Sequence, residues 1–353
     1  MKIGLVGWGI ETKSAFDYFG PTHNYLICNE EKRDDFPADC NNVSIQYLDM
    51  VRTSGMPGTI KDFSYLRDIE NCELVVFSVA ARKNLESLFN ETHHFWKIAK
   101  TTQHIFFENC PTKNIIGVTG TKGKGTTSTL IYKMLLASHY NAYLAGNIGI
   151  SVLDLLPKLK ADDWVVLELS SFQLYKLPHS PHIGVHLMMM PEHLDWHDSM
   201  EEYADAKSNL FAHQSTNDIA IYLPTNTYSL KNAEKSNGTK IPYTEEPGAY
   251  VNESGYFTID DQDICLTRDA KLLGNHNYEN ICAAVTAAWL VTRDINAIRS
   301  VITSFSGLEH RLEYIAEING ISFYDDSFGT TPDTAIVAMN AFTEPKIMIV
   351  GGS

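Results

Sequence analysis

The sequence lacks paired cysteines, long apolar runs and an excess of basic residues, and each absence excludes a class of protein. Its six cysteines are scattered through 353 residues without a C-x-x-C pair, so neither a zinc knuckle nor a disulfide framework is indicated. The apolar start is short and broken by glycines, and no later run approaches a membrane span. Lys and Arg number 28 against 43 Asp and Glu, and this charge of −15 argues against nucleic-acid or anionic-membrane partners. We expect a cytoplasmic protein.

The length and an ordinary composition, 44% hydrophobic and 20% charged, predict two or three globular domains of the α/β class. Short apolar runs alternate with helical patterns over residues 1–112, which predicts a Rossmann-like domain. Its expected elements are strands at Lys2 to Val6, Tyr25 to Cys28, Leu74 to Ser78 and Ile105 to Phe107, and a helix from Ser14 to Phe19. Pro111-Thr112-Lys113 marks the expected boundary.

A second α/β domain with a mostly parallel sheet is predicted over residues 113–306. After Ile115 to Val118, strands are expected at Ala142 to Ala145, Trp164 to Glu168, Ile183 to Met188 and Ile219 to Leu223. The polar stretch from Thr225 to Lys240 predicts a loop, and the alanine-rich stretch from Asn277 to Thr292 predicts a helix against the sheet.

The pattern restarts over residues 307–353, which predicts the beginning of a third Rossmann-like domain. Asn319-Gly320 between two strand-like runs is a hairpin signal, followed by an expected helix from Thr331 to Ala341 and a strand from Lys346 to Val350. Because a sheet domain ending on its third strand has little core of its own, we expect that the C-terminal domain is truncated.

A glycine- and lysine-rich segment between an apolar strand and a helix predicts a phosphate-binding loop. Glycines let backbone N–H groups close around phosphate oxygens, a lysine adds positive charge, and the helix N-terminus directs its dipole at the anion. The loop departs from the general pattern, because Val118 replaces the first glycine and Gly125 separates Lys124 from the hydroxyl of Thr126. We expect ATP to be bound by Gly120, Thr121, Lys122, Gly123, Lys124, Gly125, Thr126 and Thr127.

Two further strand ends carry candidate ligand-binding residues. Glu168 ends a buried-strand run, at the sheet edge where doubly wound folds bind ligands, and is the best candidate for a Mg²⁺ ligand. The alternative is a surface glutamate. Gly7-Trp8-Gly9 predicts either a nucleotide-sugar site or a purely structural turn, since Thr12 stands where a third glycine would be. Asn29 or Glu30, after the second strand, would then reach the ribose or uracil.

Several segments, in the expected order, resemble those of the Mur ligase superfamily, which joins amino acids to cell-wall precursors and includes folylpolyglutamate synthases. Glu-Leu-Ser-Ser-Phe-Gln-Leu is similar to the branch that adds D-glutamate. The resembling segments are Thr119 to Thr127, Ala145 to Gly149, Glu168 to Leu174, Pro191 to Asp195, Tyr203 to Lys207, Gly274 to Asn277, Gly307 to Arg311 and Asp325 to Ser327.

The resemblance implies roles for individual residues. Lys124, Asn147, His193 and Lys207 would be catalytic; Thr126 and Glu168 would hold one Mg²⁺, and His193 with a carbamylated Lys207 a second. A carbamate would give Lys207 the oxygen ligand that Mg²⁺ prefers, whereas without the resemblance a solvated helix lysine is the better interpretation. Asn277, Arg311 and Asp326 would contact ATP, and the substrate would be bound by Gly9, Ile10, Glu11, Asn29, Asn147, Ser170 and Ser171.

The activity implied is an ATP-dependent amide ligase of peptidoglycan synthesis. It would join D-glutamate to UDP-N-acetylmuramoyl-L-alanine through an acyl phosphate, as a monomer with ATP and two Mg²⁺ ions. The alternatives are a related ligase using L-glutamate, a folylpolyglutamate synthase, which Gly125 favours, or a non-catalytic nucleotide-binding module.

Two features depart from the family and one suggests another metal. Phe328 stands at a usual lysine position, and Val79-Ala80-Ala81 replaces a Ser-Pro-Gly turn that grips the nucleotide sugar. His193 and His197, spaced i, i+4, also suggest zinc, although most such pairs are structural.

Overall fold

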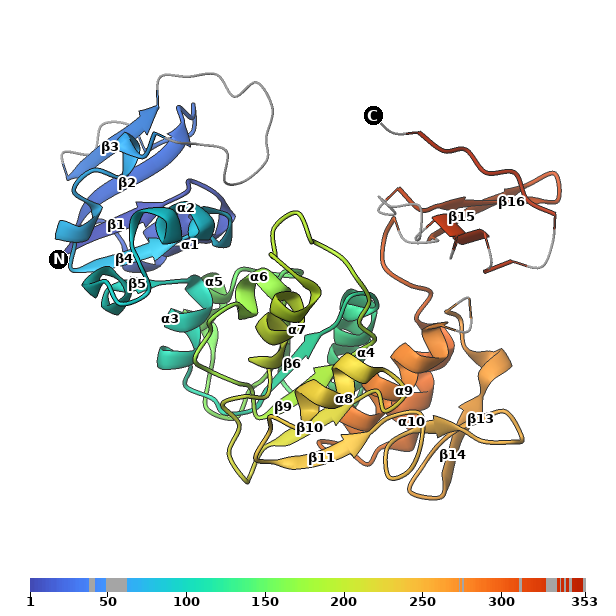
Figure 1. Ribbon diagram of the computed structural model, residues 1–353. Helices are drawn as coiled ribbons and strands as arrows, with labels where there is room; N and C mark the ends of the chain where they lie inside the picture. The colour runs from blue at the N-terminus through green and yellow to red at the C-terminus, as the bar shows by residue number, and fades with distance from the viewer. Residues whose placement is uncertain are drawn as a thin grey trace.

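The computed structural model describes residues 1–37, 42–48, 62–272, 274, 276–310, 313–327, 335–336, 338–339, 341–342 and 345–351. It contains an N-terminal sheet, a larger central sheet, a small antiparallel sheet and a C-terminal hairpin (Figure 1). This mixed α/β architecture confirms the predicted fold class. No helix among these residues is both long and apolar enough to cross a bilayer.

The N-terminal sheet is entirely parallel, in the order β3-β2-β1-β4-β5. The predicted strand from Ile105 to Phe107 is wrong, because these residues lie inside α3. Thr101 begins that helix with a capping box, accepting from the N–H of His104, and the apolar side chains face the core. The elements are β1 (Lys2–Val6), α1 (Ile10–Phe19), β2 (Asn24–Glu31), β3 (Val43–Leu48), β4 (Leu74–Phe77), α2 (Arg82–Leu88), β5 (Ala99–Lys100) and α3 (Thr102–Asn109).

The central sheet is also parallel, in the order β11-β10-β9-β6-β8-β7. Alternate residues of β8 enter different cores: Val166 packs with α4, α9 and α10, while Val165 and Leu167 join the core on the other face. The elements are β6 (Ile115–Thr119), α4 (Lys124–Ala137), β7 (Ala142–Gly146), α5 (Val152–Leu155), β8 (Trp164–Glu168), α6 (Ser171–Leu174), β9 (Ile183–His186), α7 (Met200–Ser208), β10 (Ile219–Tyr222), α8 (Thr227–Ala233), β11 (Thr239–Pro242), α9 (His276–Trp289) and α10 (Ile295–Ser304).

The predicted loop from Thr225 to Lys240 is wrong, because it contains α8 and the start of β11. Several of its polar residues have structural partners. Asn226 caps α8 by accepting from the N–H of Ser229, and the buried Ser229 hydroxyl donates to the carbonyl of His186. The buried Asn232 amide donates to the carbonyl of Ala204. The polar composition of this stretch therefore includes buried hydrogen-bonding groups and does not indicate an irregular segment.

Two smaller sheets complete the described structure. Strands β12 (Tyr250–Val251), β13 (Tyr256–Ile259) and β14 (Gln262–Leu266) form an antiparallel sheet that the sequence did not predict. The hairpin of β15 (Glu313–Ile318) and β16 (Ile321–Asp325) is confirmed, with Asn319 and Gly320 at φ of 54° and 77°.

The other expectations for the C-terminal segment fared differently. The predicted helix from Thr331 to Ala341 falls largely outside the described residues. The predicted strand from Lys346 to Val350 is wrong: these residues form no strand, and Ile347 and Ile349 are exposed. A strand needs a neighbour to receive its backbone hydrogen bonds, and none of the described segments pairs with this one.

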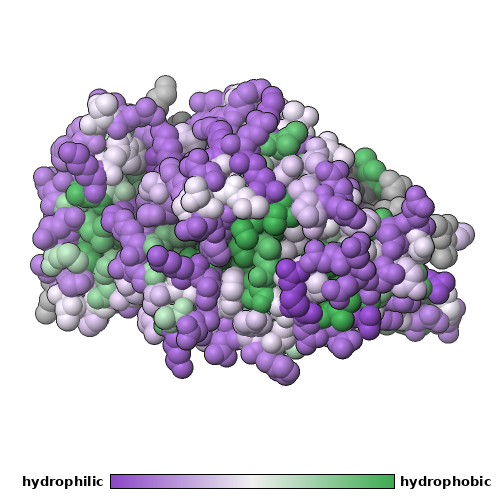
Figure 2. Space-filling model, turned by 90° about the horizontal axis from the view of Figure 1, so that it is seen from below, coloured by the Kyte–Doolittle hydropathy of each residue, from purple (hydrophilic) through white to green (hydrophobic). Residues whose placement is uncertain are grey.

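The N-terminal and central units are packed together along α1, α3 and α5. Ile3 and Leu5 share one hydrophobic core with Leu153 and Leu155. Polar contacts run beside it, since the hydroxyl of Ser14 donates to Asp154 Oδ1 at 2.6 Å. The surface is mostly hydrophilic, with narrow hydrophobic bands on the face shown in Figure 2. The two units therefore meet in a partly apolar, partly polar interface that frames the cavity described below.

Candidate active site

The predicted phosphate loop joins β6 to α4 at the carboxyl edge of the central sheet. Gly123 lies at φ +86°, and a Cβ there would come within 2.1 Å of Asn280 Oδ1, so the position requires glycine. Lys124 begins α4, and its ammonium donates to the carbonyls of Gly120 and Thr121 at 3.2 and 3.0 Å. The loop thus combines a helix N-terminus with a lysine folded over it, as phosphate binding requires.

Other loop residues are tied to the protein. The N–H of Thr121 donates to the carbonyl of Met188 at 2.8 Å, and its hydroxyl lies 3.1 Å from the hydroxyl of Tyr203. Lys122 forms a 2.6 Å ion pair with Glu192. These contacts hold the loop in shape and leave Lys124 as the cation nearest its mouth among the loop's two lysines.

A buried carboxylate faces the loop from the end of β8. Glu168 is 3% exposed, and its Oε1 accepts from the side-chain amide of Asn147 at 3.2 Å. A Cβ on Gly125 would lie 3.6 Å from Glu168 Oε2 and 2.9 Å from Leu308 Cδ1, so the extra glycine allows this close approach. Thr126 follows Gly125 in the chain. The carboxylate of Glu168 and the hydroxyl of Thr126 are the kind of oxygen ligands that a hard cation such as Mg²⁺ prefers.

Lys207 is buried beneath the loop. Projecting from α7, its amine donates to the carbonyl of Gly120 at 2.8 Å and to the hydroxyl of Thr119 at 3.3 Å. Burial, reinforced by the positive charge of Lys124, holds the pKa of Lys207 well below its usual range. The amine is therefore far more readily neutral than that of a surface lysine.

His193 lies on the segment between β9 and α7, at φ 58°. Its Nε2 is 3.6 Å from Glu192 Oε2, and partial burial lowers its pKa. His197 instead points inward, with Nε2 3.0 Å from the hydroxyl of Ser171. Among the described residues, the clusters of three groups that could hold a metal lie elsewhere and contain neither histidine, so the zinc interpretation gains no support.

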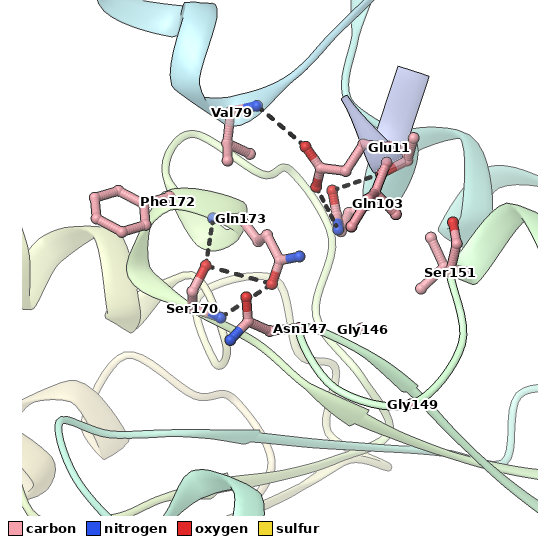
Figure 3. A pocket seen from close by; sticks show the side chains of 13 residues that line it. Glu11, Val79, Gln103, Gly146, Asn147, Gly149, Ser151, Ser170, Phe172 and Gln173 are labelled. Atoms are coloured by element: carbon pink, nitrogen blue, oxygen red, sulfur yellow. Dashed lines mark hydrogen bonds between the residues drawn. The ribbon is translucent and has the colours of Figure 1, made fainter. Parts of the chain in front are cut away.

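A cavity of about 280 Å³ lies between the N-terminal and central units (Figure 3). Glu11 enters it from α1, accepting from the N–H of Val79 at 3.2 Å and from Gln103 at 3.5 Å, and burial raises its pKa. The opposite wall includes Ser170 and Gln173, which form the capping box of α6. The lining residues are Ile10, Glu11, Val79, Thr102, Gln103, Gly146, Asn147, Gly149, Ser151, Val152, Ser170, Phe172 and Gln173.

Comparison with known proteins gives the family. The chain is 32% identical over 358 aligned residues to UDP-N-acetylmuramoylalanine–D-glutamate ligase of Clostridium kluyveri, an alignment that covers 99% of this chain and 75% of the relative. The chain belongs to the Mur ligase family. Residues 118–288 match the Mur ligase middle domain. The ligase of the same name from Acetivibrio thermocellus is 41% identical, over 70% of this chain and 54% of the relative.

The fold agrees with this assignment. A solved structure of UDP-N-acetylmuramate:L-alanyl-gamma-D-glutamyl-meso-diaminopimelate ligase from Neisseria meningitides superposes with a TM-score of 0.54 and 15% identity, covering 87% of this chain and 99% of that one. At that identity the likeness concerns the fold alone. As a Mur ligase, the protein is an ATP-dependent ligase, which confirms the enzyme class predicted from its motifs.

The structure gathers some of the predicted site residues and separates others. Ile10, Glu11, Asn147 and Ser170 line the cavity, whereas Asn29 does not: it accepts from the N–H of Trp8 and donates to the carbonyl of Glu31. Gly9 and Ser171 are adjacent to lining residues without lining the cavity themselves.

The residues predicted to contact ATP outside the phosphate loop also lie in different places. Asn277 accepts from the amide of Asn280, the residue packed against Gly123, and so lies near the loop. Asp326 follows β16, in the hairpin that Figure 1 shows apart from α4. Arg311 and Phe328 lie outside the described residues.

The sequence interpretation missed several cavity residues, of which Val79, Gln103 and Gln173 are the most informative. Val79 was noted only as a departure from the family, although its backbone N–H contacts Glu11. Gln103 precedes a segment expected to be a strand, so nothing marked it. Gln173 lies within the recognised Glu-Leu-Ser-Ser-Phe-Gln-Leu segment, and its spacing from Ser170 is a capping-box signal that identifies it.

Proposed function

We propose that this Mur ligase joins D-glutamate to UDP-N-acetylmuramoyl-L-alanine in peptidoglycan precursor synthesis, in the cytoplasm and as a monomer. One observation carries the proposal: the loop lysine Lys124, the Asn147–Glu168 pair and the buried Lys207 converge where the cavity between the two units begins. An anionic nucleotide at the loop and an acid substrate in the cavity would then meet beside Asn147. The names of the relatives support the choice of substrates.

The reaction would proceed in two steps. The carboxylate of the muramoyl substrate attacks the γ-phosphorus of ATP, which forms an acyl phosphate and releases ADP. The amine of glutamate then attacks the acyl carbon, forming the amide as inorganic phosphate leaves and a proton is released. Lys124 and the loop amides would hold the β- and γ-phosphates, and Asn147 would orient the reacting carboxylate. Positioning and charge stabilisation supply most of the catalysis in such transfers.

Two Mg²⁺ ions would reduce the repulsion between the anionic nucleophile and the phosphates. Thr126 and Glu168 would hold one of them. For the second, we propose His193 and a carbamate on Lys207. The lowered pKa supports carbamylation, because only a neutral amine attacks CO₂, forming an N–C bond and releasing a proton. The carbamate would supply the oxygen that an amine lacks.

We propose a division of labour that follows the predicted domains. Residues 1–112 would bind the uridine nucleotide, residues 113–306 would bind ATP and carry the chemistry, and residues 307–353 would begin the glutamate-binding domain. Because the cavity is lined from both of the first two regions, substrate binding depends on how they pack.

Calorimetry on this chain tests the assignment, with Mg²⁺ and a non-hydrolysable ATP analogue present. Separate titrations use UDP-N-acetylmuramoyl-L-alanine and a reduced folate. We expect the muramoyl nucleotide alone to bind. Folate binding alone would assign the protein to the folylpolyglutamate branch, and binding of neither would leave a nucleotide-binding module. Phosphate release with D-glutamate against L-glutamate then tests the stereochemistry, with faster release from L-glutamate contradicting the proposal.

A further inference from the structure

A lysine of the N-terminal unit is surrounded by side chains of the central unit. Lys83, on α2, places its ammonium 3.5 Å from Glu202 Oε1 and 3.6 Å from Asp198 Oδ1. The same ammonium lies 4.9 Å from the ring centroid of Trp196 and 5.7 Å from that of Tyr175. The Lys83 and Glu202 side chains are 21% and 24% exposed, so their ion pair and the cation–π contacts are less screened than those of a surface pair, whereas Asp198 is 86% exposed and adds little. We call this arrangement the Lys83 clamp.

The helix that carries Lys83 is itself anchored. The guanidinium of the neighbouring Arg82 lies 4.5 Å from the ring centroid of Trp96 and 5.4 Å from that of Tyr175, both outside the helix. Val79, four residues before Lys83, lines the cavity from the same unit. The ammonium therefore extends from a fixed helix next to one wall of the cavity.

The partners of Lys83 at residues 196–202 follow His193 and extend into the first turn of α7, the helix that carries Lys207. Glu202 stands in the first turn of α7 and accepts from the N–H of Asp198 at 2.7 Å, while its own N–H donates to the hydroxyl of Ser199. An ion pair on Glu202 thus acts on the start of α7.

Residues 196–202 also contact the opposite wall of the cavity. The Trp196 ring meets Phe172 edge-on at 5.0 Å, and the His197 ring stacks on Phe172 at 5.7 Å with an interplanar angle of 6°. His197 Nε2 is 3.0 Å from the hydroxyl of Ser171. Phe172 lies on α6 and lines the cavity beside Ser170, as Figure 3 shows. The segment held by Lys83 is therefore the support of this wall.

We propose that Lys83 is a positioning residue for the substrate cavity. By holding residues 196–202, it fixes the α6 wall at a set distance from the wall made by Glu11 and Val79, and it steadies the start of α7. The identity of the ligand in this inference rests on the proposed function. The clamp itself is a property of the protein without ligand.

The first test needs no ligand. Hydrogen–deuterium exchange is compared for wild type, Lys83→Met, Lys83→Arg and the control Lys176→Met. Lys176 makes a matched ion-pair set to Glu86 and Glu91 across the same interface, but neither partner lies in residues 196–202. We expect severalfold faster exchange over residues 171–174 and 196–208 in Lys83→Met only, with Lys83→Arg restoring most of the protection. Equal exchange in all four proteins would overturn the proposal.

The second test measures binding by calorimetry. In Lys83→Met, we expect the Kd for UDP-N-acetylmuramoyl-L-alanine to rise about tenfold, the scale of a lost partly buried ion pair with its cation–π contacts. The Kd for the ATP analogue should stay within about twofold, since the loop is also held by contacts outside α7, from Thr121 to Met188 and from Lys122 to Glu192. Weaker substrate binding with unchanged exchange would mean that Lys83 touches the ligand directly, which contradicts a positioning role.

The two tests separate the clamp from the proposed function. If the wild type binds no muramoyl nucleotide, the proposed function fails, and the exchange experiment alone decides the clamp. Thermal unfolding midpoints of the variants are compared first, and Lys83→Gln, which also removes the charge, serves where Lys83→Met proves too unstable to purify.

Discussion

The N-terminal and central units begin alike, with a parallel strand, a glycine-containing turn and a helix, yet their turns differ in charge and in hydrogen bonding. In the first turn, the N–H of Trp8 donates to Asn29 at 2.7 Å, the N–H of Gly9 donates to the carbonyl of Gly7, and an acid, Glu11, opens α1. In the second, Lys124 opens α4. The shared topology positions a helix N-terminus, but the side chains there decide which anion it accepts.

The largest expected effect tests the basic turn. Lys124→Ala should reduce ATP-dependent ligation by about 10²–10³-fold, the usual loss for one electrostatic contact to a transition state. Its ammonium bonds to loop carbonyls, so the fold should persist. Phosphate release and circular dichroism measure the two outcomes.

Lys13→Ala is the matched control from α1. Lys13 forms an ion pair with Asp35 and is remote from the phosphate loop, so ligation should be unchanged. Full activity of Lys124→Ala, or an equal loss in both variants, would contradict the contrast between the two turns.

The second prediction concerns the buried amine that the central unit has beneath its loop. Lys207→Ala should lower ligation at least about 100-fold, because the proposed second Mg²⁺ would lose a ligand. Added short-chain carboxylates should restore part of the activity by placing an oxygen in the vacated space. Phosphate release with and without formate or acetate provides the measurement. Unchanged activity of the variant, or a loss that neither carboxylate rescues, would count against carbamylation.

The sequence predicted the central unit better than the first because its site depends on contiguous residues. Strand β8 and the phosphate loop between β6 and α4 lie in segments that each carry their own pattern. Short edge strands such as β5 and the polar helix α8 do not, since their formation depends on distant partners.

The cavity likewise could not be predicted from sequence, because it depends on residues that are distant along the chain. Its walls come from α1, the turn at Val79, α3 and α6, and no single segment records that these meet. Asn29 illustrates the converse. Its type and position suit a ribose contact, but its amide oxygen accepts from Trp8 in the first turn and its amide nitrogen donates to the carbonyl of Glu31 on its own strand. Chemical type was predictable from sequence, whereas the partner of each side chain required the tertiary structure.

The third prediction concerns a variant that makes the turn before α1 less acidic, and so more like the loop before α4. Glu11→Gln removes the acid at α1 while keeping an oxygen to accept from the N–H of Val79. Because burial raises the pKa of Glu11, the wild type should bind the anionic muramoyl nucleotide more tightly as the pH falls and the carboxyl is neutralised. The variant should bind about 3–10-fold more tightly at pH 8, an effect typical of one partly screened charge.

Calorimetry from pH 5.5 to 8 distinguishes the outcomes. The pH dependence should be weaker in Glu11→Gln, whereas Glu108→Gln, which removes an acid paired with Lys100 outside the cavity, should behave as the wild type. Weaker binding by Glu11→Gln would instead mean that the carboxylate accepts a hydrogen bond from the substrate.

The smallest effect compares two helix starts that both use a capping box, Thr101 with His104 at α3 and Ser170 with Gln173 at α6. Burial, with the nearby His179, lowers the pKa of His104 to about 4. The unfolded chain then binds more protons below about pH 6.5, so stability is lost as the pH falls through that value toward 4. His104→Gln makes α3 resemble α6 and removes this loss. Calorimetric unfolding should show equal midpoints at pH 8 and a variant higher by roughly 2–4 °C at pH 5; parallel curves would show that His104 titrates alike in both states.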